Sequence, residues 1–83
     1  MSDSHPRNTL ARACDILYGT TAVVTWEEEQ VIGPEHAAIF EWVVKINNTE
    51  YGRGLGSTIK KARNEAARVA LAKLREEHPD LKF

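Results

Sequence analysis

Three cations lie near the start of the last predicted helix, where they could bind phosphate. Lys60 and Arg63 are three residues apart and share one face of that helix. Lys61 points about 100° away, but its side chain is long enough to bend back. The first N–H groups of a helix have no intrahelical partners, and the helix dipole adds positive charge at the same end. This combination predicts an anion site.

A histidine follows a turn made by glycine and proline. Gly33 and Pro34 predict the turn, and Glu35 leads to His36 at its tip. An exposed imidazole there can hydrogen-bond to hydroxyls or base edges. The other two histidines and the single cysteine are scattered, so we expect neither a zinc site nor another cofactor.

Charge is separated along the 83-residue chain. The formal net charge is −1, and the pI of about 6.3 lies below the ~9 typical of nucleic-acid-binding domains. Residues 58–75 nevertheless carry six basic residues and one acid, a local charge of +5 that leaves −6 elsewhere. Such a division directs a polyanion to one element. We expect the acidic run Glu27, Glu28 and Glu29 to be solvated and to repel a polyanion.

Length and composition favour one small domain. The chain is too short for two independent cores. No apolar run approaches the roughly 20 residues of a membrane helix, and the start lacks the features of a secretory signal. The lone Cys14 excludes an internal disulfide and fits a reducing compartment. We expect a cytoplasmic or nuclear protein with one domain, residues 6–77, between tails at 1–5 and 78–83.

Hydrophobic periodicity predicts an α+β fold. A helix with one apolar stripe runs from Pro6 to Tyr18. Three strands follow, over residues 22–30, 40–46 and 50–55. A helix of about 20 residues then ends before Pro79. The order α-β-β-β-α indicates a three-stranded antiparallel sheet with two helices packed on one face.

Small residues indicate how the last helix meets the sheet. Gly52, Gly54 and Gly56 recur at period two, which leaves one face of their strand open to another backbone. We predict that the facing side of the helix consists of Ala62, Ala66, Ala67, Ala70, Val69, Leu71 and Leu74. The aromatic residues at strand spacing are expected in the core rather than in base stacking: Trp26, Trp42 and Tyr51.

The chain resembles the double-stranded RNA-binding domain family over residues 6–75. The matching features are Pro6 and Leu10, Trp26 at a position that is usually tyrosine, the turn Gly33-Pro34-Glu35-His36, Phe40, Val44, Ile46, the pair Gly54 and Gly56, and the helix segment TIKKARNEAARVAL. They occur in the family's order and at its distances. Such domains read the shape of A-form RNA, spanning roughly 16 base pairs across two minor grooves and the major-groove phosphates between them.

The resemblance implies three RNA contacts. The first helix would enter one minor groove with Thr9, Arg12 and Asp15, the turn would enter the next with Gly33, Pro34, Glu35 and His36, and the last helix would bind phosphates with Lys60, Lys61 and Arg63. The family usually has glutamate at position 12, a glutamine-like residue at 15 and lysine at 59. Losing the phosphate contact at Ile59 should lower the salt slope by about 0.9. Arg12, Lys61 and Arg53 are the candidates to compensate.

The sequence thus predicts non-catalytic, largely sequence-independent binding of double-stranded RNA. An alternative is a protein-interaction or dimerisation module of the same fold, with weak or lost RNA binding, acting in an RNA-processing or silencing complex. A third is the accessory domain of an enzyme, since ribonuclease III, Dicer-like and RNA-editing proteins carry similar domains. No nucleophile with a partnered base can be assembled from Cys14 and the histidines, so we expect no catalytic residues. We expect no membrane partner.

Overall fold

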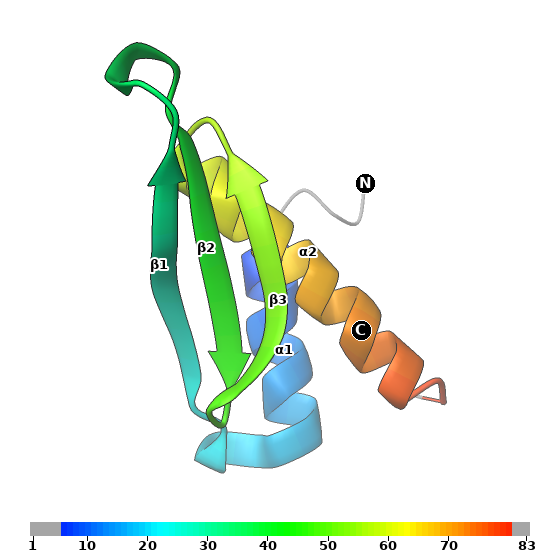
Figure 1. The fold of residues 1–83 in the computed structure, drawn as a ribbon. Coiled ribbons are helices and arrows are strands. Elements are labelled where there is room, and N and C mark those ends of the chain that lie inside the picture. The colour runs from blue at the N-terminus through cyan, green and yellow to red at the C-terminus, as the bar shows by residue number, and fades with distance from the viewer. Residues whose placement is uncertain (1–5, 81–83) are drawn as a thin grey trace.

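The computed structural model describes residues 6–80 (Figure 1). Its elements are α1 (Pro6–Tyr18), the 3₁₀ turn η2 (Gly19–Thr21), β1 (Val24–Ile32), the 3₁₀ turn η3 (Glu35–Ala37), β2 (Ile39–Ile46), β3 (Thr49–Gly56) and α2 (Ile59–Glu77). The strands form one antiparallel sheet in the order β1-β2-β3. The predicted fold class is therefore confirmed. Residues 1–5 and 81–83 of the predicted tails lie outside the described residues.

Strand β1 begins and ends two residues later than its sequence pattern predicts. Ala22 ends the turn η2 with its N–H directed to the Gly19 carbonyl, so it is not available to begin the strand. At the other end, pairing with β2 continues to Ile32 opposite Ile39. The register shifts between Glu28 and Gln30, which is the irregularity predicted for this half of the strand.

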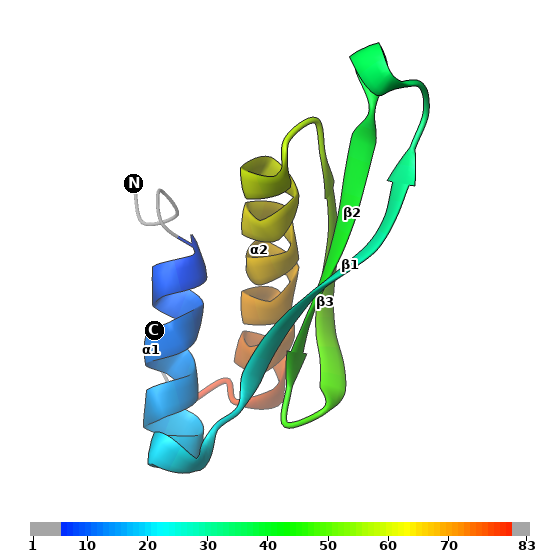
Figure 2. The same ribbon diagram turned by 90° about the vertical axis from the view of Figure 1, so that its left-hand side faces the viewer.

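Both helices lie on one side of the sheet and run in the same direction (Figure 2). Their apolar faces share a core with the inner face of the sheet, made of Leu10, Ala13, Cys14, Val44, Ile46, Ala66, Ala67, Ala70, Leu71 and Leu74. Trp26 and Tyr51 pack at the margin of this core, as the strand spacing predicts. The parallel helices consequently begin at the same end of the molecule.

Helix α2 lies directly against the backbone of β3. A Cβ atom at Gly54 would lie 2.5 Å from the Ala62 carbonyl oxygen and would also overlap the Ala66 amide nitrogen. Real Cβ atoms essentially never approach other atoms this closely, so the glycine face predicted from period two is what allows the helix to approach. Val69 is an exception to the predicted helix face. It is 42% exposed, because its position on the helix falls outside the alanine and leucine stripe.

Candidate nucleic-acid interface

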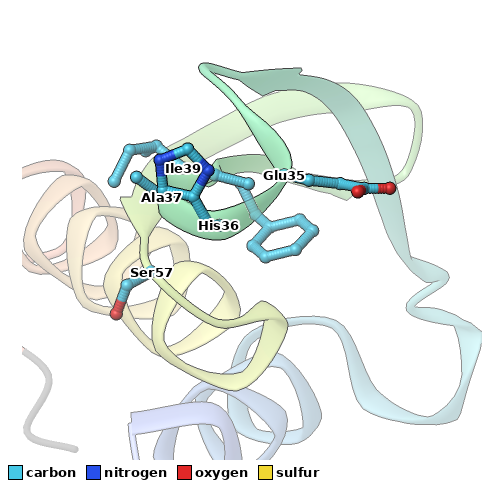
Figure 3. A pocket seen from close by; sticks show the side chains of 7 residues that line it. Glu35, His36, Ala37, Ile39 and Ser57 are labelled. Atoms are coloured by element: carbon cyan, nitrogen blue, oxygen red, sulfur yellow. The ribbon is translucent and has the colours of Figure 1, made fainter.

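The turn that carries His36 and the start of α2 lie at the same end of the molecule. His36 and Ser57, the residue before the α2 cap, line one cavity of about 370 Å³. Figure 3 shows the imidazole on the side of this cavity that faces Ser57, whereas the Glu35 side chain extends in the opposite direction. The two features predicted to contact one ligand are therefore neighbours in space.

Backbone geometry explains how the turn presents His36. Gly33 has φ of +89°, a value that favours glycine. Pro34 is extended, and its carbonyl accepts a hydrogen bond from the Ala37 N–H at 2.9 Å. This bond closes the single turn η3, in which His36 is exposed. The turn η3 forms the tip of the β1–β2 hairpin (Figure 1), so His36 is exposed at this tip.

The start of α2 is fixed by a side-chain cap. The Thr58 hydroxyl accepts a hydrogen bond from the Lys61 N–H at 3.1 Å, and the Thr58 carbonyl accepts one from the Ala62 N–H at 3.0 Å. Lys60 and Lys61 are both exposed at this end, where the helix dipole also favours an anion. Ile59 is 42% exposed beside them, so the missing lysine of the family pattern leaves an apolar side chain at the surface.

Arg63 does not join these lysines at the surface. Its guanidinium carbon lies 4.6 Å from the ring centroid of Trp42 and 5.6 Å from that of Trp26, and the residue is half-buried. The Nε atom is buried and has no hydrogen-bond partner within residues 6–80. Helical spacing alone places Arg63 beside Lys60. This spacing does not reveal the two indole faces on the inner side of the sheet. Such faces bind a weakly hydrated guanidinium well.

The predicted contact face of α1 lies at the outer side of the helical layer. Arg12 and Asp15 are exposed on this helix, and Thr9 is half-buried. Helix α1, the start of α2 and the hairpin tip follow one another across the molecule (Figure 2). The three regions implied by the family resemblance therefore form a row.

Arg53 lies outside this row. It projects from the face of β3 opposite to the glycine face, where it pairs with Glu50 at 3.0 Å and with Glu29 and Glu41 at 3.5 Å each. Hydrogen bonding to Glu50 is the main cause that raises the pKa of Arg53. In this structure Arg53 pairs with carboxylates on the outer face of the sheet, away from position 59 at the start of α2.

The acidic run of β1 is exposed, as expected, and two of its carboxylates form ion pairs. Lys45 pairs with Glu27 at 3.1 Å, and Arg53 pairs with Glu29. Val43, on the same outer face, is 1% exposed and lies opposite Glu27 and Arg53 in the strand register. The predicted patch is thus a set of exposed ion pairs across the outer face.

The described part of the chain has neither a metal-binding cluster of side chains nor a helix suited to a membrane. No group of three or more histidine, cysteine, aspartate or glutamate side chains there could hold a metal ion. Within the same residues, no helix is both long and apolar enough to cross a bilayer.

Comparison with known proteins identifies the family. The sequence model of the double-stranded RNA binding motif matches residues 12–74. Ribonuclease 3 of Corynebacterium efficiens is 49% identical over 45 residues, which are 54% of this chain and 18% of that protein. Ribonuclease 3 of Campylobacter concisus is 33% identical over 63 residues, 75% of this chain and 28% of that protein. The chain spans less than a third of these relatives. Because the motif covers most of the chain, this protein belongs to the double-stranded RNA binding motif family.

Proposed function

We propose that this protein binds double-stranded RNA by its shape, without catalysing a reaction. One observation supports this proposal above all. The hairpin tip with His36 and the start of α2 with its lysines lie at one end of the molecule, in a row with α1 (Figure 2). A-form RNA presents two successive minor grooves separated by major-groove phosphates. The row has the same order: a hydrogen-bonding tip for one minor groove, a cationic helix start for the phosphates, and a polar helix face for the second minor groove.

Each region has a separate chemical task in this proposal. His36, held out by Gly33 and Pro34, bonds 2′-hydroxyls or base edges in one minor groove. Lys60 and Lys61 bind the phosphates of the intervening major groove. Arg12 and Asp15 face the second minor groove, where Arg12 donates and Asp15 accepts from a 2′-hydroxyl.

The proposal also assigns a role to the outer face of the sheet. The carboxylates of Glu27, Glu29 and Glu41 gather there with only Lys45 and Arg53 against them. An acidic surface repels a phosphate backbone, so it restricts the RNA to the opposite end and side of the molecule.

A salt-dependent titration tests this function. An RNA duplex of about 20 base pairs, longer than the roughly 16 that one domain spans, is compared with duplex DNA and single-stranded RNA. We expect the tightest binding to the RNA duplex. Binding that is equal for DNA and RNA, or absent for RNA at low salt, contradicts the proposal.

A matched pair of lysine variants locates the phosphate contact. Lys60→Ala removes a charge from the start of α2, whereas Lys45→Ala removes the same charge from the opposite face. We expect the first variant to reduce the salt slope by about 0.9 and to weaken binding to all duplex sequences alike, with little change for the second. Equal effects of both variants would place the RNA elsewhere.

Three exposed side chains favour a second candidate, self-association through the outer face. Ile32, Ile39 and Leu55 are all exposed near the hairpin end of the sheet. Ile32 pairs directly with Ile39 across the strands. Such apolar neighbours are typical of a protein contact. Sedimentation distinguishes the candidates: a concentration-dependent dimer that ignores salt, without RNA binding, supports this one, and a monomer that binds duplex RNA contradicts it.

The ribonuclease 3 relatives motivate a direct test of the non-catalytic part of the proposal. We expect a duplex incubated with the purified protein and Mg²⁺ to stay intact, because no nucleophile with a partnered base can be assembled from Cys14 and the histidines. Cleavage that co-purifies with the protein and is lost in the Lys60→Ala variant would overturn this expectation.

A further inference from the structure

A second cavity lies between the helical layer and β1. It has a volume of about 390 Å³ and is lined by Arg7, Asn8, Leu10, Ala11, Val24, Trp26 and Arg63. Helix α1 contributes four of these residues, β1 contributes two and α2 contributes Arg63. The volume falls within the range of roughly 300–1,000 Å³ of small-molecule sites. We call this cavity the α1–β1 groove.

The lining combines an aromatic and aliphatic surface with two cations. Trp26, Leu10 and Val24 provide the apolar part, and the indole is the aromatic group of the lining. Arg7 and Arg63 provide two guanidinium groups, and Asn8 adds an amide. This composition fits a ligand with a planar ring at one end and an anion at the other.

The electrostatics of the α1–β1 groove favour an anion. None of its seven lining residues is acidic, in contrast to the outer face of the sheet. Arg63 is already held in place by the faces of Trp26 and Trp42, so little conformational freedom remains to be lost when it binds. Guanidinium groups bind phosphate oxygens with two parallel hydrogen bonds. The positive end of the α1 dipole lies near Arg7 and adds to this preference.

Four of the residues that line the groove belong to α1, so the groove borders that end of the proposed contact row. Helix α1 is the outermost of the three regions, and the hairpin tip is at the other end (Figure 2). A nucleotide beyond the duplex end at α1 would be near these lining residues. Paired bases are stacked inside the helix, so only an unpaired nucleotide can offer its base to Trp26.

We propose that the α1–β1 groove binds one unpaired nucleotide at the end of the bound RNA, with the base against Trp26 and the phosphate between Arg7 and Arg63. This inference rests on the proposed binding of double-stranded RNA. It adds recognition of the strand end to recognition of duplex shape.

Mononucleotides test the groove without a duplex. The protein contains two tryptophans, so a Trp42→Phe variant leaves Trp26 as the only tryptophan, whose fluorescence can be excited apart from that of the tyrosines. We expect adenosine monophosphate to quench Trp26 and to bind at least about tenfold more tightly than either adenosine or ribose 5-phosphate, a difference of about 1.4 kcal/mol. If the variant fails to fold, the indole N–H signals of the unaltered protein report the same titration by nuclear magnetic resonance. The absence of any response, or equal affinity for all three compounds, overturns the inference.

Duplex ends test it within the complex. An RNA hairpin with a stem of about 16 base pairs, the length one domain covers, is prepared with a blunt end or with one extra unpaired nucleotide. We expect about tenfold tighter binding of the extended hairpin. Arg7→Ala should remove this preference and leave blunt binding unchanged, and Arg68→Ala, an exposed arginine of α2, serves as the matched control.

The outcomes separate the two proposals. Equal binding of both hairpins by the unaltered protein overturns the nucleotide groove and leaves duplex recognition intact. Failure to bind either hairpin contradicts the proposed function. A preference that persists in Arg7→Ala overturns the assignment of the phosphate to the groove.

Discussion

Replacing Gly54 by alanine tests how the close approach of α2 to the sheet is achieved. The added Cβ would lie 2.5 Å from the Ala62 carbonyl oxygen, about 0.9 Å inside the 3.4 Å of ordinary contact, and closer still to the Ala66 nitrogen. All of the nearest atoms belong to the backbone of α2. No side chain can rotate to relieve the overlap, so the whole helix has to move away from β3.

The expected cost follows from this geometry. Overpacking a core costs about 1–3 kcal/mol, and we expect about 3 kcal/mol because the overlap involves main-chain atoms only. A domain of this size has a total stability of about 4–12 kcal/mol. Since each kcal/mol shifts the Tm of a small domain by about 4–8 °C, the variant should melt about 12–24 °C lower.

Thermal and urea unfolding, followed by circular dichroism, measure the effect. Leu55→Ala is the control, because Leu55 is the next residue of β3 and is 52% exposed. We expect the control to change the free energy of unfolding by less than about 0.5 kcal/mol. If the free energy of unfolding of the Gly54→Ala variant also lies within this margin of the unaltered protein, the argument that backbone contact requires glycine is refuted.

Three further predictions concern single side chains. Arg63→Ala should lower the free energy of unfolding by about 1–2 kcal/mol in chemical denaturation, through loss of its contact with the indoles; an unchanged stability would indicate a free surface cation. Hydrogen bonding with Tyr18, followed by burial and the Glu77 carboxylate, raises the pKa of Tyr51, so this tyrosine stabilises the fold below its ordinary pKa of about 10 and less so as the pH rises above it. Tyr51→Phe should therefore flatten the fall of stability above that pH, and a curve that keeps its slope would oppose this assignment. Ile59→Lys should steepen the salt dependence of duplex binding by about 0.9 in slope, and a constant slope would exclude position 59 from phosphate contact.

Much of the fold was predictable because local patterns and packing agree. The period-two glycines indicate a helix seated on the backbone of β3, and the overlap at Gly54 confirms it. Strict alternation from Phe40 to Ile46 predicts the inner face of β2, where Val44 and Ile46 are buried. The exact ends of β1 were not predictable in the same way, because the turn η2 and pairing with Ile39 set them.

The position of the candidate site was predictable from the sequence, but the contacts of all its charged side chains were not. The turn at Gly33 is a local signal, and it lies where the sequence places it. The environment of Arg63 depends on residues about 20 and 40 positions earlier in the chain, so helical spacing alone cannot reveal it. For the same reason, the ion pairs of Arg53 with Glu29 and Glu41 could be predicted only with knowledge of the strand register.

The hairpin tip stands on a two-stranded ribbon that extends beyond the helical layer (Figure 2). The reach from the α2 lysines to His36 is consequently determined by how many residues β1 and β2 contain past the start of α2. Each added residue lengthens a strand by about 3.4 Å. Only an even number of residues keeps every side chain on its present face. The length of the ribbon can therefore change only in steps of about 7 Å if every side chain is to keep its face, and this length sets the distance between the two proposed RNA contacts.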